Sequence, residues 1–218
     1  MALRLAHRGD HRVHAENSLA ALQAAARVAG CDGVEFDVRF SKDGEPVVLH
    51  DDTLERVQER PERAADLSAR ELERLGVPRL DTVLAKLPPA FFLDIELKEP
   101  ARPAFAAVLL ARRGDRPRAV AISCFNPALL AALDPRLAAW PRWLNTRELS
   151  AAVVDTVLAA GVTAVAADWP AIDEAGVQRA RGAGLSVVAW TVRRRPTRDR
   201  LDRLGVAAVC VEGRALEP

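Results

Sequence analysis

The chain contains the stretch Gly33-Val34-Glu35-Phe36-Asp37-Val38, in which two acidic residues alternate with apolar ones. Because successive side chains of a strand point to opposite faces, Glu35 and Asp37 lie on the same face. Two like charges in a buried strand repel each other, and each is costly to bury unless a positive group neutralises it. A divalent cation would neutralise both. The stretch therefore predicts a buried strand that carries part of a charged site.

Three further stretches carry charged or titratable side chains at or near the ends of apolar runs. Glu96 and Lys98 share one strand face, while His7, Arg8 and His50 lie at the ends of apolar runs. Together with the first pair, these residues supply carboxylates for a metal, histidines for proton transfer and cations for an anion, which is typical of phosphoryl transfer. The stretches are Leu3-Arg4-Leu5-Ala6-His7-Arg8-Gly9, Pro46-Val47-Val48-Leu49-His50 and Phe91-Phe92-Leu93-Asp94-Ile95-Glu96-Leu97-Lys98.

Short apolar runs alternate with Ala/Leu/Arg-rich helical patterns along most of the chain, which predicts repeated β-α units around a parallel sheet. Eight such units indicate a closed α/β barrel of the TIM (β/α)8 class. A single barrel domain over 1–218 is expected, since one α/β barrel fits this length. The predicted strands are 3–7, 33–38, 90–96, 118–123, 138–144, 162–167, 185–191 and 206–211.

Helices are predicted between these strands, at 17–29, 101–113, 127–133, 150–160, 173–183 and 196–204. Asn17, Ser150 and Asp173 are expected to cap three of them. Residues 39–89 break the regular alternation. There the turn Ser41-Lys42-Asp43-Gly44 precedes 46–50, and a polar segment leads to a short helix around 81–87. This region is interpreted as a small insertion after the second strand, where barrel enzymes place functional loops.

The overall amino-acid composition does not indicate a particular binding partner. The net charge is +1, from 31 basic and 30 acidic residues, so nucleic acid is not expected as a partner. No apolar run approaches the roughly 18 residues of a membrane span, and charged residues come too early for a signal peptide. Cys31, Cys124 and Cys210 are widely spaced and are interpreted as reduced thiols. A soluble cytoplasmic protein is expected, and homo-oligomerisation stays open.

Eight short motifs, in this order and spacing, resemble those of the glycerophosphodiester phosphodiesterase family. The resemblance covers essentially the whole chain and is strongest from residue 5 to 56. The motifs are His7-Arg8-Gly9, Glu16-Asn17-Ser18, Glu35-Phe36-Asp37, Lys42-Asp43-Gly44, His50-Asp51, Glu96-Leu97-Lys98, Ser123-Cys124-Phe125-Asn126-Pro127 and Trp190-Thr191-Val192.

The resemblance implies a TIM-barrel hydrolase that cleaves glycerophosphodiesters to sn-glycerol 3-phosphate and an alcohol with a divalent metal. It places the histidine pair on His7 and His50, and the phosphate-contacting cations on Arg8 and Lys98. The implied metal carboxylates are Glu35, Asp37 and Glu96. Because these ligands are hard oxygens without a Cys/His cluster, Mg²⁺ or Ca²⁺ fits better than zinc.

Several alternatives stay open at this stage. Arg8 and Lys98 would also neutralise the carboxylates in a salt-bridge network without metal, and the two histidines would then be ordinary strand-end residues. Trp190 either packs against glycerol carbons or belongs to the core. His11 and His14 are expected to be exposed loop residues.

Among rival functions, a lysophospholipase D-like or phosphoinositol-type phosphodiesterase would need an apolar entrance, against which the short insertion argues. A non-catalytic barrel that binds glycerophosphodiesters ranks last because both histidines are present.

Two positions depart from the family pattern. Arg193-Arg194-Arg195 follows Trp190-Thr191-Val192, where Asn is usual, and Val211-Glu212-Gly213-Arg214 replaces a usual Asp-x-Pro. Neither departure is expected to touch the proposed catalytic residues. The arginines are interpreted as a solvated loop balanced by Asp199 and Asp202, with an anionic head-group site as the alternative.

Overall fold

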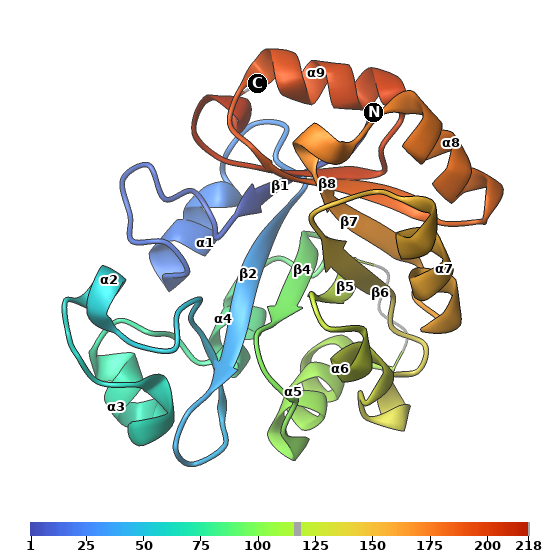
Figure 1. Cartoon of the computed structure of the whole chain (residues 1–218). Coiled ribbons are helices and arrows are strands. Elements are labelled where there is room, and N and C mark those ends of the chain that lie inside the picture. The colour runs from blue at the N-terminus through green and yellow to red at the C-terminus, as the bar shows by residue number, and fades with distance from the viewer. Residues whose placement is uncertain (116–118, 218) are drawn as a thin grey trace.

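The computed structural model describes residues 1–115 and 119–217, and its strands form a closed barrel (Figure 1). Eight parallel strands are hydrogen-bonded in the order β1-β9-β8-β7-β6-β5-β4-β2, and pairing of β1 with β2 closes the ring. The predicted TIM (β/α)8 class is therefore confirmed. The strands are β1 (Leu3–His7), β2 (Gly33–Phe40), β4 (Phe92–Leu97), β5 (Val120–Cys124), β6 (Arg142–Thr146), β7 (Ala164–Asp168), β8 (Ser186–Val192) and β9 (Ala208–Val211).

Helices follow most strands and cover the outside of the barrel. Ser150 and Asp173 cap α7 and α8 as predicted, because each side chain accepts a backbone N–H of the first turn. The predicted cap Asn17 is wrong by one residue, since Ser18 accepts the N–H of Ala21. The helices are α1 (Leu19–Ala25), α5 (Pro103–Arg113), α6 (Pro127–Ala131), α7 (Ala151–Ala159), α8 (Glu174–Gly182) and α9 (Arg195–Leu204).

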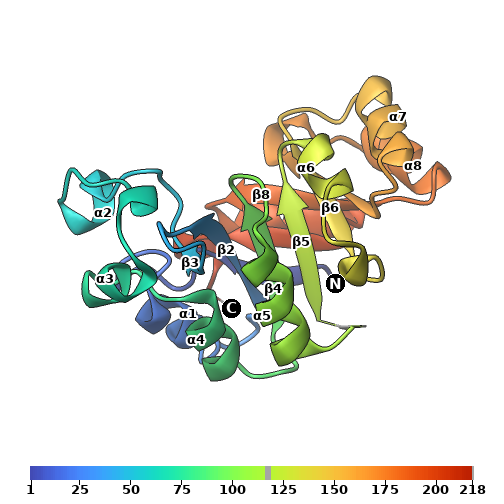
Figure 2. The same cartoon turned by 90° about the horizontal axis from the view of Figure 1, so that it is seen from below.

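The insertion after β2 has its own secondary structure and its own small core. Strand β3 (Pro46–Val48) pairs antiparallel with β2, and α4 (Leu80–Lys86) is the predicted short helix. Two helices in the predicted polar segment were missed, α2 (Glu55–Gln58) and α3 (Ala69–Arg74). In Figures 1 and 2, α2 and α3 lie on the opposite side of the molecule from α7 and α8. The core under them consists of Val47, Leu49, Leu54, Ala64, Ala69, Leu72 and Val77.

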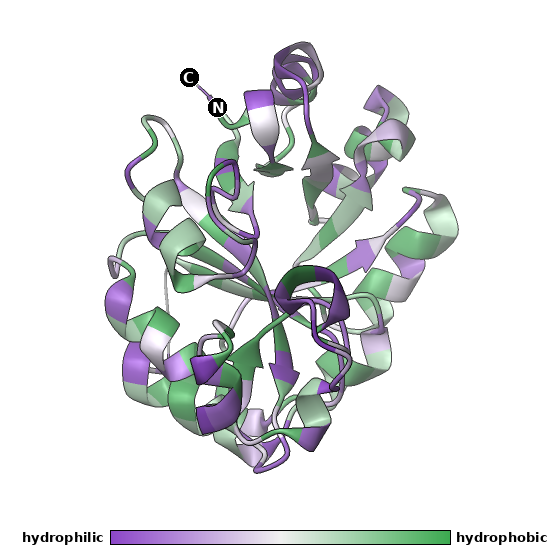
Figure 3. Cartoon of the chain, turned by 90° about the vertical axis from the view of Figure 1, so that its left-hand side faces the viewer, coloured by the Kyte–Doolittle hydropathy of each residue, from purple (hydrophilic) through white to green (hydrophobic). Residues whose placement is uncertain are grey.

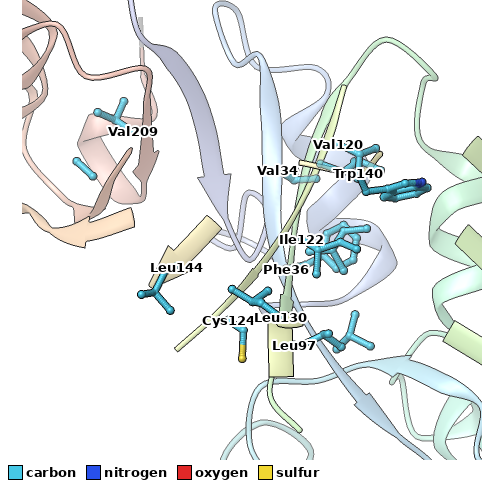
Figure 4. Packing of buried hydrophobic residues seen from close by; sticks show 14 of the residues in the cluster. Val34, Phe36, Leu97, Val120, Ile122, Cys124, Leu130, Trp140, Leu144 and Val209 are labelled. Atoms are coloured by element: carbon cyan, nitrogen blue, oxygen red, sulfur yellow. The ribbon is translucent and has the colours of Figure 1, made fainter. Parts of the chain in front are cut away.

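The strands separate two further apolar layers. Val34, Phe36, Ile122 and many others pack between strands and helices, with Trp140 fully buried among them (Figure 4). A smaller cluster, defined by residues such as Leu5, Trp143 and Val188, fills the barrel interior. Phe92 stacks on Trp143 there, with ring centroids 5.5 Å apart. This inner cluster forms the floor beneath the polar side chains at the barrel mouth.

Gly33 shows how tightly the interior is packed. A Cβ at this position would lie 2.3 Å from the carbonyl oxygen of Phe92 and 2.7 Å from Leu5 Cδ2. Real Cβ atoms do not approach other atoms this closely. Only glycine therefore fits at position 33, where β2 pairs with β1 on one side and with β4 on the other.

The strand predicted at 138–144 was placed too early. β6 begins at Arg142, and Trp140 packs in the outer core before the strand starts. For the strand predicted at 118–123, residue 118 lies outside the described residues, and β5 begins at Val120.

In Figure 3 hydrophobic residues lie on both strands and helices, whereas the helix at the top, α9, is mostly hydrophilic. No helix in the described part of the chain is long and apolar enough to cross a membrane.

Candidate active site

Polar side chains replace apolar ones where β1, β2 and β4 reach the mouth of the barrel. The register pairs His7 with Glu35, Glu35 with Asp94, and Asp37 with Glu96. Because the strands are parallel, their carboxyl ends meet at one end of the barrel. Alternation along each strand then turns these side chains inward, above the apolar floor.

A cavity of about 240 Å³ opens at this end of the barrel. Nearly all the site residues predicted from the sequence line this cavity, although they come from distant parts of the chain. Asp37 does not line it, because its side chain is buried to 1% exposure beside the cavity wall. The lining residues are His7, Arg8, Glu35, His50, Asp94, Glu96, Lys98, Phe125, Asn145, Trp190, Thr191, Arg193 and Cys210.

Glu35, Asp37 and Glu96 form a compact acidic cluster. One carboxylate oxygen from each lies within 4.8 Å of the others. Glu35 Oε1 is buried without a hydrogen-bond partner among the described residues. Burial and the neighbouring Asp37 charge raise the pKa of Glu35 well above its usual range. Three hard oxygen donors with an unpaired buried oxygen fit a divalent cation such as Mg²⁺ or Ca²⁺.

Arg8 and Lys98 contact the same cluster. Lys98 Nζ lies 2.9 Å from Asp37 Oδ1 and also pairs with Glu96, while Arg8 Nε lies 3.2 Å from Asp37 Oδ2. Burial alone would raise the pKa of Asp37, but these two cations hold it below its usual range. Burial and the Asp37 charge still raise the pKa of Glu96. The salt bridges that the sequence left open as an alternative are therefore present. The cluster has three carboxylates and two contacting cations, so it keeps a net negative charge when all of them are ionised.

Asp94 is a fourth buried carboxylate, which sequence analysis did not assign. Its pairing with Glu35 places it on the inner face of β4, and it lines the cavity. Burial raises the pKa of Asp94 to about 7, and the charges of Glu96 and Asp37 add to the rise. The signal was available in the sequence, because Asp94 and Glu96 are two residues apart on one strand and must share a face.

His50 is held by a chain of charged side chains. Its Nδ1 lies 2.7 Å from Asp51 Oδ1, and Arg56 Nε donates to the other Asp51 oxygen at 2.7 Å. Arg56 also donates to Glu16 at 2.6 Å, and Glu16 accepts from Arg8 at 2.7 Å. The chain of contacts thus joins the insertion to the first loop of the barrel. Burial lowers the pKa of His50, although Asp37 and Asp51 oppose the effect.

The loop after β1 is shaped by unusual backbone angles. Arg8 has a φ of 57° and Gly9 a φ of 84°. A Cβ at Gly9 would lie 2.6 Å from the carbonyl carbon of Ala21, so only glycine allows the loop to pack on α1. Asn17, at φ 58°, donates from Nδ2 to Asp37 Oδ2 at 2.7 Å. Strained residues of this kind are typical of functional sites, where they aim side chains.

Three cavity-lining residues, Phe125, Asn145 and Trp190, are uncharged and form a neutral wall. Trp190 Nε1 donates to the Ala166 carbonyl at 2.7 Å, and its ring meets Phe125 edge-on with centroids 5.4 Å apart. Asn145 lines the same cavity. Trp190 is half-buried and packs against the inner cluster, so it faces both the floor and the cavity.

Comparison with known proteins is consistent with this geometry. The model of the glycerophosphoryl diester phosphodiesterase family matches residues 7–213. The chain belongs to this family. A member from Thermotoga maritima has 26% identity over 97% of this chain and 94% of that one, with a TM-score of 0.82. An Oleispira antarctica phosphodiesterase, solved in complex with the product sn-glycerol-3-phosphate, has 23% identity over 97% and 93% and a TM-score of 0.84.

Curated relatives of the glycerophosphoryl diester phosphodiesterase family match over shorter segments. Rat glycerophosphodiester phosphodiesterase 1 is 41% identical over 72 residues, which cover 33% of this chain and 22% of that protein. The glycerophosphodiester phosphodiesterase of Caldanaerobacter subterraneus is 40% identical over 71 residues, covering 33% and 29%. The chain therefore matches less than a third of the length of these two relatives.

Both departures from the glycerophosphoryl diester phosphodiesterase pattern reach the site, and the expectation that neither would is wrong. Arg193 lines the cavity, and Glu212 contacts a predicted catalytic residue. Closure of β9 against β1 places Glu212 next to His7, with Oε1 4.0 Å from Nδ1. Glu212 also lies 3.2 Å from His11 Nε2 and 2.6 Å from Arg193. Burial, reinforced by Arg8, lowers the pKa of His7 to about 4. His11, expected to be an exposed loop residue, is instead half-buried against Glu212. His14 is exposed as expected.

The arginine run is solvent-exposed as expected, but its predicted partners are wrong. Asp199 pairs with Arg198, and Asp202 accepts the backbone N–H of Ala2. The carboxylates that contact the run are Glu212, beside Arg193, and Glu217, beside Arg195.

Proposed function

We propose that residues 1–218 form one barrel domain that hydrolyses glycerophosphodiesters to sn-glycerol 3-phosphate and an alcohol with one divalent cation. The observation that carries the proposal is a single cavity lined by two histidines, three basic side chains and buried carboxylates. Family membership supports the reaction class, and the product complex of the Oleispira antarctica protein supports the glycerol phosphate half of the substrate.

Substrate binding is assigned to the cations and the neutral wall. The Arg8 guanidinium presents planar donors that suit phosphate oxygens, and the Lys98 ammonium adds a compact positive charge beside them. Trp190 and Phe125 provide aromatic surface for the glycerol carbons, with Asn145 as a polar partner for hydroxyl groups. This division orients the phosphodiester across the cavity.

The cation is assigned to Glu35, Asp37 and Glu96, with Mg²⁺ or Ca²⁺ as the metal. When bound, it supplies positive charge that offsets the negative charge growing on the phosphoryl oxygens. Burial and like-charge repulsion raise the pKa of Glu35 and Glu96, and a cation held by these residues would offset the repulsion. Asn17 and Arg8 hold Asp37 in place through direct contacts.

Proton transfer is assigned to the histidines. His7 has a depressed pKa, so it is neutral near pH 7 and can accept the proton of the attacking hydroxyl group. His50 contacts Asp51 at 2.7 Å, and this carboxylate stabilises the charged imidazolium. His50 is therefore the better proton donor to the leaving alkoxide, as the bond between phosphorus and the alcohol oxygen breaks.

Two attacking groups use this same set of residues. The vicinal hydroxyl of the glycerol can attack phosphorus and give a cyclic phosphate, which water then opens, or water can attack directly. Phosphorus NMR during turnover distinguishes the two routes, because only the first accumulates or releases a cyclic phosphate.

Reduced Cys31, Cys124 and Cys210 support a reducing compartment such as the cytoplasm.

The first test measures sn-glycerol 3-phosphate release from a panel of glycerophosphodiesters with and without metal. We expect release that is lost after EDTA dialysis and restored by Mg²⁺ or Ca²⁺, because the acidic cluster lacks enough positive charge alone. Undiminished release after exhaustive EDTA dialysis would contradict the metal assignment. Absence of release from every substrate with every metal would contradict the proposed function itself.

A further inference from the structure

A strongly basic hollow adjoins the active-site cavity. Its volume is about 840 Å³, and it is lined by Arg193, Arg194, Arg195, Pro196, Arg214 and Glu217. Arg193 lines the catalytic cavity as well, so this one residue forms the boundary between the two spaces. A substrate in the cavity that reaches Arg193 therefore also reaches the edge of the hollow.

The charges in the hollow are not balanced. Arg195 pairs with Glu217 at 2.9 Å, but Glu217 is also 3.5 Å from Arg12. Within residues 1–115 and 119–217, no carboxylate oxygen lies within 4.0 Å of the guanidinium groups of Arg194 or Arg214. Two arginines thus line the hollow without an acidic partner among the described residues, and both are exposed.

Arg193 can also take part, although it contacts Glu212 at 2.6 Å. Its side chain is 70% exposed. Ion pairs of such exposed side chains contribute little to stability, and many contribute nothing measurable. An anion that enters the hollow can therefore compete with Glu212 for Arg193.

The two ester arms of the substrate meet different surfaces. The glycerol arm suits the neutral wall of Trp190 and Phe125. With the glycerol arm there, the alcohol arm is the one left to reach Arg193, which lines both the cavity and the arginine-lined hollow. Guanidinium groups bind phosphate oxygens in a bidentate manner, and several around one space select a doubly charged group over a neutral one.

We propose that the hollow binds a second phosphate group carried by the alcohol of the substrate, so that the enzyme prefers glycerophosphodiesters with a phosphorylated alcohol. This rests on the proposed function, because the catalytic cavity must hold the diester. Arg194 and Arg214 supply the unpaired cations, and Arg193 positions the group at the boundary.

The test compares glycerophosphoglycerol with its derivative phosphorylated on the second glycerol, two substrates that differ by one phosphate. For the wild-type protein we expect kcat/KM to be at least about tenfold higher for the phosphorylated substrate, the effect of a charge-assisted hydrogen bond or more. The preference should shrink with added KCl, because the arginines are exposed. Equal kcat/KM for the two substrates would overturn the proposal.

The decisive variant is Arg194→Ser with Arg214→Ser. Serine at position 194 is a favourable residue at the N-terminal cap of α9, so the fold is expected to persist. We expect the preference to fall to within about twofold while kcat/KM for glycerophosphoglycerol stays unchanged. The matched control, Arg70→Ser with Arg203→Ser, removes the same charge from exposed positions outside the hollow and should keep the preference. A preference that survives in the Arg194/Arg214 variant would overturn the proposal.

Two further measurements distinguish failure of the phosphate-site proposal from failure of the proposed function. Calorimetric titration of both substrates into the His50→Ala protein measures binding without turnover. If the phosphorylated substrate binds more tightly but the wild-type protein hydrolyses neither substrate, phosphate binding in the hollow is supported and the proposed function is contradicted. If the two substrates bind equally, only the phosphate site in the hollow is overturned. The second measurement is co-sedimentation with phosphatidylglycerol vesicles. If co-sedimentation depends on Arg194 and Arg214 while kcat/KM is equal for the two substrates, the hollow binds a lipid surface and the proposal is overturned.

Discussion

The two halves of the barrel mouth differ sharply in chemistry. Strands β1, β2 and β4 present histidine and carboxylates, whereas β6 and β8 present Asn145 and Trp190. Both halves belong to one parallel barrel with the same alternation of side chains. Charge is therefore concentrated on adjacent strands, where these groups lie close enough to bind one cation and one anion together. In the proposed function, the neutral half recognises uncharged parts of the substrate.

The largest effect is expected on the charged side. His7→Ala and His50→Ala should each lower kcat by about 10²–10⁴, the usual loss for a general acid or base. The double variant should be little worse than either single one if the histidines act as a pair. Steady-state kinetics with circular dichroism to verify folding provides the measurement. Near-wild-type turnover in either single variant would refute the role of that histidine.

On the neutral side, Trp190→Ala should raise KM by about tenfold and change kcat much less, because it removes aromatic surface but no charge. Trp190→Phe is the matched control, since it keeps a ring and loses only the hydrogen bond to the Ala166 carbonyl. A fall in kcat as large as that of His7→Ala would break the division between the halves. An unchanged KM would make Trp190 a core residue.

A smaller effect is expected where the insertion supports the charged side. Asp51→Asn removes the carboxylate that raises the pKa of His50, so that pKa should fall further. We expect kcat to drop by about three- to tenfold and the limb of the pH profile assigned to His50 to move to lower pH. Asp52→Asn is the control, because Asp52 is exposed and pairs with Arg63 instead. Identical profiles for the two variants would exclude a positioning role for Asp51.

The smallest effect concerns stability without metal. Burial raises the pKa of Glu35, so the folded protein holds a proton that the unfolded chain releases above about pH 4.5. Stability therefore falls as pH rises above that value. Glu35→Gln should remove part of this fall and raise the free energy of unfolding at pH 8 by about 1–2 kcal/mol, or roughly 3–6 °C in Tm.

Thermal unfolding in EDTA at pH 5 and pH 8 measures this effect. Exposed Glu73→Gln is the control and should change neither value. A destabilised Glu35→Gln protein at pH 8 would show that the carboxylate is already satisfied without metal.

Sequence patterns were sufficient to predict those site residues that lie together on one strand. Alternation alone places Glu35 with Asp37 and Glu96 with Lys98, and the same rule would have found Asp94. Glu212 is different, because its approach to His7 depends on closure of the last strand against the first. Helices α2 and α3 were missed because both are too short for a periodic pattern. Helix α3 is stabilised by packing of Ala69 and Leu72 in the insertion core, whereas α2 is four residues long and buries none of its own residues.

The separate core of the insertion has a kinetic consequence for the enzyme. His50 follows directly after Leu49, which packs in that small core and not in the main one. Small clusters of this kind open as cooperative units at lower free energy than the barrel around them. Each opening would displace His50, the proposed proton donor, while the proposed site residues on the barrel strands stay in place. Heat or denaturant should therefore inactivate the protein before the barrel melts, and amide hydrogen exchange in the insertion should follow the loss of turnover.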